Sequence, residues 1–264
     1  MLNIFFFAAL IIYFAAVLLH FVGIAFKKNV LTAIGKYAYF AAFALHSAYI
    51  VMRGIYAGRF PMANQFEFAM SFAWGISLFC IVLQTKFKLD WIVAVAYPAT
   101  FLMLSYAALL PREITDLMPA LRSAWFVLHI GSAVFSYAAF LLAGCAGVRY
   151  LLTLRKNFDT KSTQLMQMDY FAYRLIALGM LLLTVVILSG CIWAEQAWSR
   201  FWSWDPKETW AFITWVLYAV YLHQRLRKNW QGKRMAIFAI VAVGVVLFTF
   251  IGVNQLLPGL HSYA

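Results

Sequence analysis

The sequence predicts an all-α protein that crosses a membrane several times. Of the 264 residues, 65% are hydrophobic and only 11% are charged, a composition that excludes a soluble globular domain. Long apolar runs recur along the whole chain. The loops between these runs alternate between strongly and weakly basic, which is expected of loops on opposite sides of a bilayer.

Apolar runs of about 20 residues, the length of helix that crosses a bilayer, occur eight times. The first run has no basic residue before it, so we expect a retained span and not a cleaved signal peptide. We treat residues 1–264 as one transmembrane domain. The predicted spans are residues 3–26, 34–53, 67–85, 91–110, 124–152, 170–193, 207–224 and 235–257.

The basic residues divide unevenly between the two sets of loops, with fifteen on one side and six on the other. The fifteen are Lys27, Lys28, Lys36, Lys86, Lys88, Arg149, Arg155, Lys156, Lys161, Arg174, Arg225, Arg227, Lys228, Lys233 and Arg234. The six are Arg53, Arg59, Arg112, Arg122, Arg200 and Lys207. Basic loops remain in the cytoplasm, so both termini are predicted to lie outside it. The net charge of +12 therefore requires no nucleic-acid partner.

The first two spans each carry a histidine, His20 and His46. A buried ionisable group in lipid is a candidate for function, although a neutral histidine bonded to a neighbouring helix satisfies the same physics. The loop that follows has Asn64 and Glu67 at the spacing of a capping box, so we expect it to begin the third helix.

Six of the ten tryptophans fall within residues 193–215, in the sequence WAEQAWSRFWSWDPKETWAFITW. Indoles at a membrane surface form either a general interfacial belt or a platform for a flat, apolar ligand. We expect an external loop at 193–210, in which Trp198 and Trp202 share one face of a short helix. Asp205, Pro206 and Glu208 predict the capped start of the next helix.

Three further histidines lie near predicted helix ends. Trp125 and His129 are four residues apart at the outer end of the fifth span, and His223 ends the seventh. A histidine in the last turn of a helix, such as His223, also interacts favourably with the helix dipole, and this is the structural explanation for that residue. Pro258 and Gly259 break the last helix, so His261 is predicted on the same side as His129 and the tryptophans.

The sequence gives no support for a disulfide, a zinc site, a c-type haem attachment site or a nucleotide-binding site. Cys80, Cys145 and Cys191 each fall in or beside an apolar segment without a nearby cysteine, which favours small core side chains over a disulfide or zinc site. There is no Cys-x-x-Cys-His, so the chain is not itself a c-type cytochrome. The longest polar loop has no nucleotide-binding motif.

The tryptophan-rich segment resembles a known family. The pattern W-A-x-x-x-W-x-x-x-W-x-W-D-P-K-E-T-W is similar to the WWD signature of the cytochrome c assembly family, which handles haem, and most similar to its CcsA/ResC branch. Glu195 stands where an amide is expected, and Ser199 where a glycine is usual. The segments WFVLHIGSAVFSYAAF, YAVYLHQR and NQLLPGLHSY, and a Pro-x-x-Asn-x-x-Glu segment, also resemble the family.

The resemblance implies a haem site on the outer side, with His129 and His261 as axial ligands of the iron. His223 would belong to a second haem site within the membrane, with His20 as an internal alternative to a partner's histidine. The wall of the outer site would comprise Trp193, Trp198, Trp202, Trp204, Asp205 and Trp210. Arg122, Arg200 or Lys207 is expected to pair with the haem propionates.

The resemblance also implies a reaction. Haem b, iron protoporphyrin IX, would be delivered to the outer face and attached covalently to the cysteines of an apocytochrome c CxxCH motif, as in a haem lyase of system II cytochrome c biogenesis. No side chain of this chain is needed as a nucleophile. The expected partners are a CcsB/ResB-like subunit, apocytochrome c and the bilayer of a bacterial inner membrane, or of a thylakoid.

Two alternatives remain open from the sequence. The chain could bind haem and pass it on without forming the thioether bonds, as a transporter or chaperone does. It could also be a quinone-linked or ion-coupled subunit in which the histidines relay protons.

Overall fold

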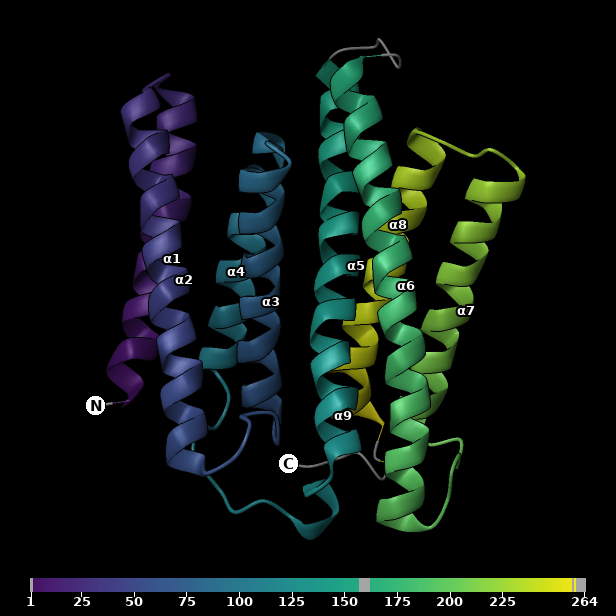
Figure 1. Ribbon diagram of the computed structural model, residues 1–264. Helices are drawn as coiled ribbons and strands as arrows, with labels where there is room; N and C mark the ends of the chain where they lie inside the picture. The colour runs from purple at the N-terminus through teal and green to yellow at the C-terminus, as the bar shows by residue number, and fades with distance from the viewer. Residues whose placement is uncertain (1, 157–161, 258, 260–264) are drawn as a thin grey trace. The chain divides into compact units, whose positions relative to one another are not determined.

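The computed structural model describes residues 2–156, 162–257 and 259. These residues form helices and no β-strand, as predicted (Figure 1). A helix satisfies its own backbone N–H and C=O groups, which is what a segment surrounded by lipid requires. In this part of the chain, seven helices are long and apolar enough to cross a membrane. The chain is therefore a polytopic integral membrane protein, whereas the orientation of its termini stays a prediction.

The seventh predicted span is the exception. It forms helix α7 (Pro206–Arg227), but it is not among the seven helices that are apolar enough by composition. Charged residues at both of its ends and several tryptophans and tyrosines lower its mean hydropathy. The prediction of eight spans thus yields eight long helices, of which composition alone supports seven as membrane-crossing.

The contacts within the chain form two compact units, residues 1–117 and residues 118–264. We describe each unit by itself, and a single domain over residues 1–264 stays a prediction. Unit 1 contains four long helices, in which α1 contacts α2 and α4, and α3 contacts the same two helices. Its elements are α1 (Leu2–Ala25), α2 (Asn29–Ala57), α3 (Gln65–Lys86), η1 (Asp90–Ile92) and α4 (Val93–Ala108).

The interior of unit 1 contains polar side chains among its apolar ones. The buried face of α2 consists of Gly35, Tyr39, Ala42, His46, Tyr49 and Arg53. The hydroxyl groups of Tyr39 and Thr100 are hydrogen-bonded at 2.8 Å, and those of Tyr13 and Ser77 at 3.0 Å. Such bonds between helices replace the hydrophobic driving force that lipid cannot supply. Apolar side chains such as Ile11, which is 65% exposed, face outward instead.

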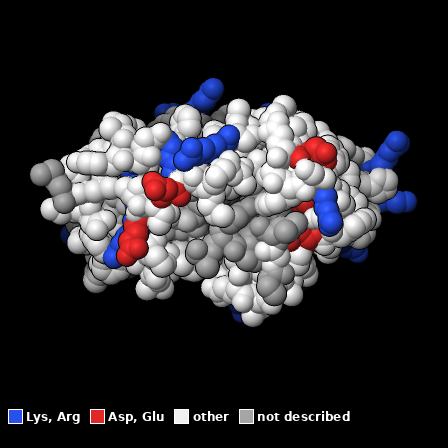
Figure 2. Space-filling view, turned by 90° about the horizontal axis from the view of Figure 1, so that it is seen from below, with Lys and Arg blue, Asp and Glu red and all other residues white. Residues whose placement is uncertain are grey.

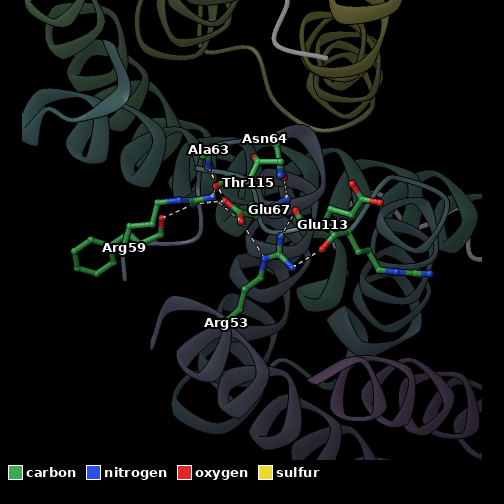
Figure 3. Close-up of polar contacts among 9 residues, drawn as sticks. Arg53, Arg59, Ala63, Asn64, Glu67, Glu113 and Thr115 are labelled. Carbon is green, nitrogen blue, oxygen red and sulfur yellow. Dashed lines mark hydrogen bonds and ion pairs between the residues drawn. The ribbon is translucent and has the colours of Figure 1, made fainter. Parts of the chain in front are cut away.

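A fully buried glutamate joins two arginines at one end of unit 1 (Figure 3). The carboxylate of Glu67 accepts hydrogen bonds from Nε of Arg53 at 2.9 Å and from Nη1 of Arg59 at 2.8 Å. Arg53 also donates to the backbone carbonyls of Arg112 and Glu113. The cluster therefore ties α2 and α3 to the segment that follows α4.

The predicted cap of α3 forms only in part. The side chain of Asn64 accepts a hydrogen bond from the backbone N–H of Glu67 at 2.9 Å, as the spacing predicted. The Glu67 carboxylate accepts from the N–H of Ala63 at 2.7 Å, and not from that of Asn64 as a reciprocal capping box would require. One of its two arginine partners, Arg53, lies in α2, so the carboxylate faces that helix.

Unit 2 holds four long helices and several short ones. Helix α5 contacts α6 and α8, and α7 contacts the same two helices. The elements are η2 (Pro119–Leu121), α5 (Ala124–Lys156), α6 (Thr163–Trp198), α7 (Pro206–Arg227), α8 (Lys233–Leu247), η3 (Phe248–Gly252), which is a π-helical turn, and α9 (Val253–Leu256). Helices α5 and α6 extend beyond the predicted ranges 124–152 and 170–193, because their polar ends remain helical.

Two of the cysteines are buried in helices, as predicted for small core side chains. These are Cys80 in unit 1 and Cys191 in unit 2, while Cys145 is partly buried.

Glycines in α5 let α8 approach closely. A Cβ atom at Gly147 would lie 2.7 Å from the carbonyl oxygen of Ala236, and one at Gly144 would lie 2.5 Å from Cγ2 of Val243. Real Cβ atoms almost never approach another heavy atom this closely. Small residues are common where membrane helices cross, because they allow the backbones to come near each other.

We expect Gly147→Ala to lower the melting temperature of the detergent-solubilised protein, because the added methyl group would collide with the rigid backbone of α8. Overpacking of this kind typically costs about 1–3 kcal/mol. The matched control is Gly244→Ala in α8, where an added Cβ meets no atom of the described residues within 4 Å. Equal melting temperatures for the two variants would contradict this packing.

Candidate functional site

The tryptophan-rich segment begins as a helix and not as a loop. Helix α6 continues through Trp193 to Trp198 and ends at Ser199, whose φ of 56° is left-handed. Residues 199–205 are not helical. The predicted short helix that would place Trp198 and Trp202 on one face is therefore wrong. The left-handed conformation of Ser199, which favours glycine, ends α6 between the two tryptophans.

The start of α7 agrees with the sequence. The Asp205 side chain accepts a hydrogen bond from the N–H of Lys207 at 3.0 Å. The Glu208 carboxylate accepts from the N–H of Asp205 at 3.2 Å and from that of Ser203 at 2.9 Å. This completes the predicted capping box. The same two carboxylates therefore hold the end of the α6–α7 loop in place.

Four tryptophans form two edge-to-face pairs around this loop. The ring centroids of Trp193 and Trp198 are 4.8 Å apart, and those of Trp202 and Trp204 are 5.6 Å apart. Trp193 is buried and Trp204 is 68% exposed. The indole N–H of Trp202 is buried and has no hydrogen-bond partner among the described residues. The loop thus offers an exposed aromatic surface and a hydrogen-bond donor.

The last two tryptophans of the segment pack within unit 2. Trp210, which was predicted to line the site, lies against Phe248 of the π-helical turn, with the ring centroids 4.5 Å apart. Trp215 donates from Nε1 to the hydroxyl of Thr184 at 3.0 Å. These contacts attach α7 to η3 and α6.

His129 lies on α5 against α6. Its Nδ1 is 2.8 Å from the carbonyl oxygen of Val186, and its ring is nearly parallel to that of Trp193, with centroids 5.9 Å apart. A carbonyl oxygen can only accept, so Nδ1 carries the proton and the lone pair is on Nε2. Neutral imidazole in this tautomer is a suitable ligand for a metal ion.

The C-terminal segment meets the same loop. A Cβ atom at Gly259 would overlap the carboxylate of Asp205, so this backbone lies directly against the cap of α7. The predicted ligand His261 lies outside the described residues. The α6–α7 loop and the start of α5 lie at one end of unit 2 (Figure 1).

The other histidines are elsewhere. His223 is exposed on α7, towards the opposite end of that helix from the tryptophan loop. His46 is fully buried in unit 1, and neither ring nitrogen has a hydrogen-bond partner among the described residues. His20 is partly buried in α1 beside Tyr97, with the ring centroids 5.7 Å apart.

The three cations suggested as propionate partners differ in exposure. Arg122 and Arg200 are exposed, whereas Lys207 is partly buried beside Asp205. Among the described residues, the end of the helices seen in Figure 2 carries a few separate basic and acidic side chains on a mainly uncharged surface.

Several residues of the site were not predicted. Trp193 donates from Nε1 to the carbonyl of Ala120 at 2.8 Å, and the hydroxyl of Ser123 donates to the side-chain oxygen of Gln196 at 2.9 Å. A Cβ atom at Gly190 would lie 2.7 Å from Nδ1 of His129. The only indication of the contact between Gly190 and His129 in the sequence is a glycine one helical turn before Trp193.

Comparison with known proteins confirms the family resemblance. The sequence profile of the Cytochrome C assembly protein family matches residues 62–261. A cytochrome c biogenesis protein CcsA of Prochlorococcus marinus is 38% identical over 248 residues, which cover 81% of this chain and 78% of the relative. One from Marchantia polymorpha is 33% identical over 280 residues, which cover 88% of each chain.

A solved structure has a similar fold. It is described as cytochrome c heme lyase CcmF and matches with a TM-score of 0.73, covering 95% of this chain and 46% of that chain. The identity of 15% supports a shared fold alone. On the family match and the CcsA relatives, the chain belongs to the cytochrome c assembly protein family, within which it is similar to the CcsA-type members.

Proposed function

We propose that this chain binds haem at the tryptophan-bearing end of unit 2 and presents it for covalent attachment to an apocytochrome c. The observation that carries the proposal is the convergence of three distant segments. The ring of His129 lies against that of Trp193, Trp193 packs on Trp198 where α6 ends and the α6–α7 loop begins, and Gly259 lies against Asp205 at the other end of that loop. Membership of a family that assembles cytochrome c supports haem as the ligand.

His129 and His261 are the proposed axial ligands of the haem iron. The tautomer of His129 supports this role, because it leaves the lone pair on Nε2. His261 is two residues after Gly259, and two residues of extended chain span at most about 7 Å. The imidazole of His261 therefore has the reach to approach the same loop. Two histidines on opposite faces of a porphyrin are a common means of holding haem iron.

The loop tryptophans are proposed to contact the flat face or edge of the porphyrin. Trp204 is exposed, and the buried indole N–H of Trp202 is a suitable donor to a propionate. Arg122, Arg200 and Lys207 remain the candidates for pairing with propionate charge. Trp193 and Asp205 act indirectly, by holding α6 and the start of α7. Trp210 supports the loop from its contact with Phe248.

The proposed reaction adds two thiols of a CxxCH motif to the two vinyl groups of haem b. In each addition the S–H bond breaks, sulfur bonds to one vinyl carbon and the hydrogen goes to the other, so no leaving group forms. The substrate supplies both thiols and a histidine that replaces one axial ligand. The residues of this chain bind and orient haem, which raises the effective concentration of the reacting groups.

A second subunit of the CcsB/ResB kind is proposed to contact α7. Only Thr214, Tyr218 and Tyr221 of this helix are buried. An exposed stripe with three- and four-residue spacing runs along α7 and includes Ile213, Val216, Val220 and His223. A transmembrane helix of the partner that lies on this stripe could supply a second histidine for a haem bound at His223 within the membrane. The proposed location is a bacterial inner membrane, or a thylakoid, with the outer site facing away from the cytoplasm.

A haem chaperone that transfers haem without forming thioethers is the second candidate, because the same geometry would serve it. Adding reduced apocytochrome c to the reconstituted complex separates the two. A haem lyase produces haem that stays with the cytochrome after denaturing electrophoresis. Haem that remains extractable into acidic solvent would favour the chaperone.

We expect His129→Ala and His261→Ala each to abolish the bis-histidine absorption spectrum of the purified protein, because each removes an axial ligand. His46→Ala is the comparison, since His46 lies in unit 1, and it should retain the spectrum. Retention of an unchanged spectrum by both His129→Ala and His261→Ala would disprove the proposed haem site.

Gly259→Ala should weaken haem binding about tenfold or more, because displacing a group that supports a ligand typically has that effect. The added methyl group would overlap the Asp205 carboxylate and displace the segment that carries His261. Haem titration of the apoprotein gives the affinity, with Gly244→Ala as the control. Equal affinities would show that the contact at Asp205 does not serve the site.

A further inference from the structure

We propose that Gly190 and the backbone carbonyl of Val186 position His129 as an iron ligand. This inference rests on the haem site proposed above and assigns a role to two residues of α6 that do not themselves touch haem. Gly190 supplies the space for the imidazole, and Val186 fixes its tautomer and direction. Both are positioning residues.

The space at Gly190 is matched to the imidazole ring. A Cβ atom built there would lie 2.7 Å from Nδ1 and 2.8 Å from Cε1 of His129. Any side chain at this position would therefore occupy the volume of the ring. Glycine in a helix interior is less favourable than alanine by about 1 kcal/mol. Gly190 therefore lowers the intrinsic stability of α6 at the place where His129 contacts this helix.

Val186 lies one helical turn before Gly190, on the same face of α6. Its carbonyl oxygen is 2.8 Å from Nδ1 of His129. A helical carbonyl has two lone pairs, so it can accept this bond beside its backbone bond within α6. The hydroxyl of Ser189 is a more distant donor to the same oxygen, at 3.3 Å, and makes its shorter bond of 2.6 Å to Val185. Because the oxygen only accepts, Nδ1 must donate, and Nε2 becomes the basic nitrogen. A histidine that ligates a metal usually donates its other ring N–H to such an acceptor, and this bond fixes its tautomer and ring orientation in the same way.

Trp193 restrains the ring from the next turn of the helix. Its indole is inclined by 26° to the imidazole of His129, and its own Nε1 donates to the carbonyl of Ala120 at 2.8 Å. Phe126, which lies one turn before His129 on α5, packs on the same indole with centroids 5.2 Å apart. The imidazole therefore has a contact at Gly190, a hydrogen bond at Val186 and a neighbouring ring at Trp193.

A methyl group at position 190 would affect the ligand more than the fold. The atoms that it meets belong to the end of a side chain, which can rotate away, and not to a rigid backbone. The rotation would break the bond from Nδ1 to Val186 and turn Nε2 away from its place. The helix itself would gain the higher propensity of alanine. Stability and iron ligation should consequently change in opposite directions.

The test compares the full-length wild type with Gly190→Ala in detergent, each titrated with ferrous haem b. We expect Gly190→Ala to melt at the same or a higher temperature and to bind haem about tenfold to a hundredfold more weakly. We also expect its bis-histidine spectrum to be lost. Added free imidazole should restore a bis-imidazole spectrum, because it replaces the displaced ligand without repairing the fold.

The control is Gly131→Ala, the same change two residues from His129 on α5. An added Cβ there meets no atom of the described residues within 4 Å. This variant should keep the wild-type spectrum and affinity. If Gly131→Ala and Gly190→Ala lose haem equally, any added methyl near His129 is disruptive and the role of Gly190 is refuted.

The remaining outcomes are also decisive. An unchanged spectrum and affinity in Gly190→Ala would overturn the positioning role and leave the haem site intact. Loss of haem together with a lower melting temperature and no recovery with imidazole would show a folding defect, which also overturns it. A wild type that binds no haem would instead refute the proposed function, on which the inference rests.

Discussion

The reciprocal cap at the start of α7 is the interaction on which the candidate site depends. Asp205 accepts from the N–H of Lys207, and Glu208 accepts from the N–H groups of Ser203 and Asp205. These bonds satisfy amides that a helix start leaves without intrahelical partners. They also fix the loop that carries Trp202 and Trp204. Since Gly259 lies against the Asp205 carboxylate, the same group connects the loop to the C-terminal segment.

The two units differ in how their helices meet. In unit 1 polar side chains face inward and join helices, as in the Glu67 cluster and the tyrosine hydroxyl pairs. Removal of one partner from such a buried ion pair leaves an uncompensated charge, which is strongly destabilising. Unit 2 also has buried hydrogen bonds between helices, from the hydroxyl of Ser136 to the carbonyl of Gly179 and between the hydroxyls of Thr214 and Thr249. Its helices α5 and α8 approach through glycine contacts, and its aromatic loop lies at the ends of α6 and α7. A ligand or partner in water can reach a helix end, but it cannot reach a side chain buried between helices.

His129 and His46 illustrate how the surroundings determine the chemistry of one residue type. Both are histidines in membrane helices. His46 is fully buried, and its ring nitrogens have no hydrogen-bond partner in the described part of the chain. His129 has a carbonyl partner that sets its tautomer and is partly exposed near the aromatic loop. This combination of a defined tautomer and an accessible ring is what a ligand role requires.

The sequence alone determined the membrane class, the long helices and the caps at Asn64 and Asp205, because composition and spacing act locally. Tertiary structure decided the rest. Ser199 adopted a left-handed conformation that separated Trp198 from Trp202, and Glu67 turned towards arginines instead of completing its cap. The contact of His129 with Val186 and Gly190 joins segments far apart in the chain. Periodicity describes neighbours along one helix and carries no information about which helices meet.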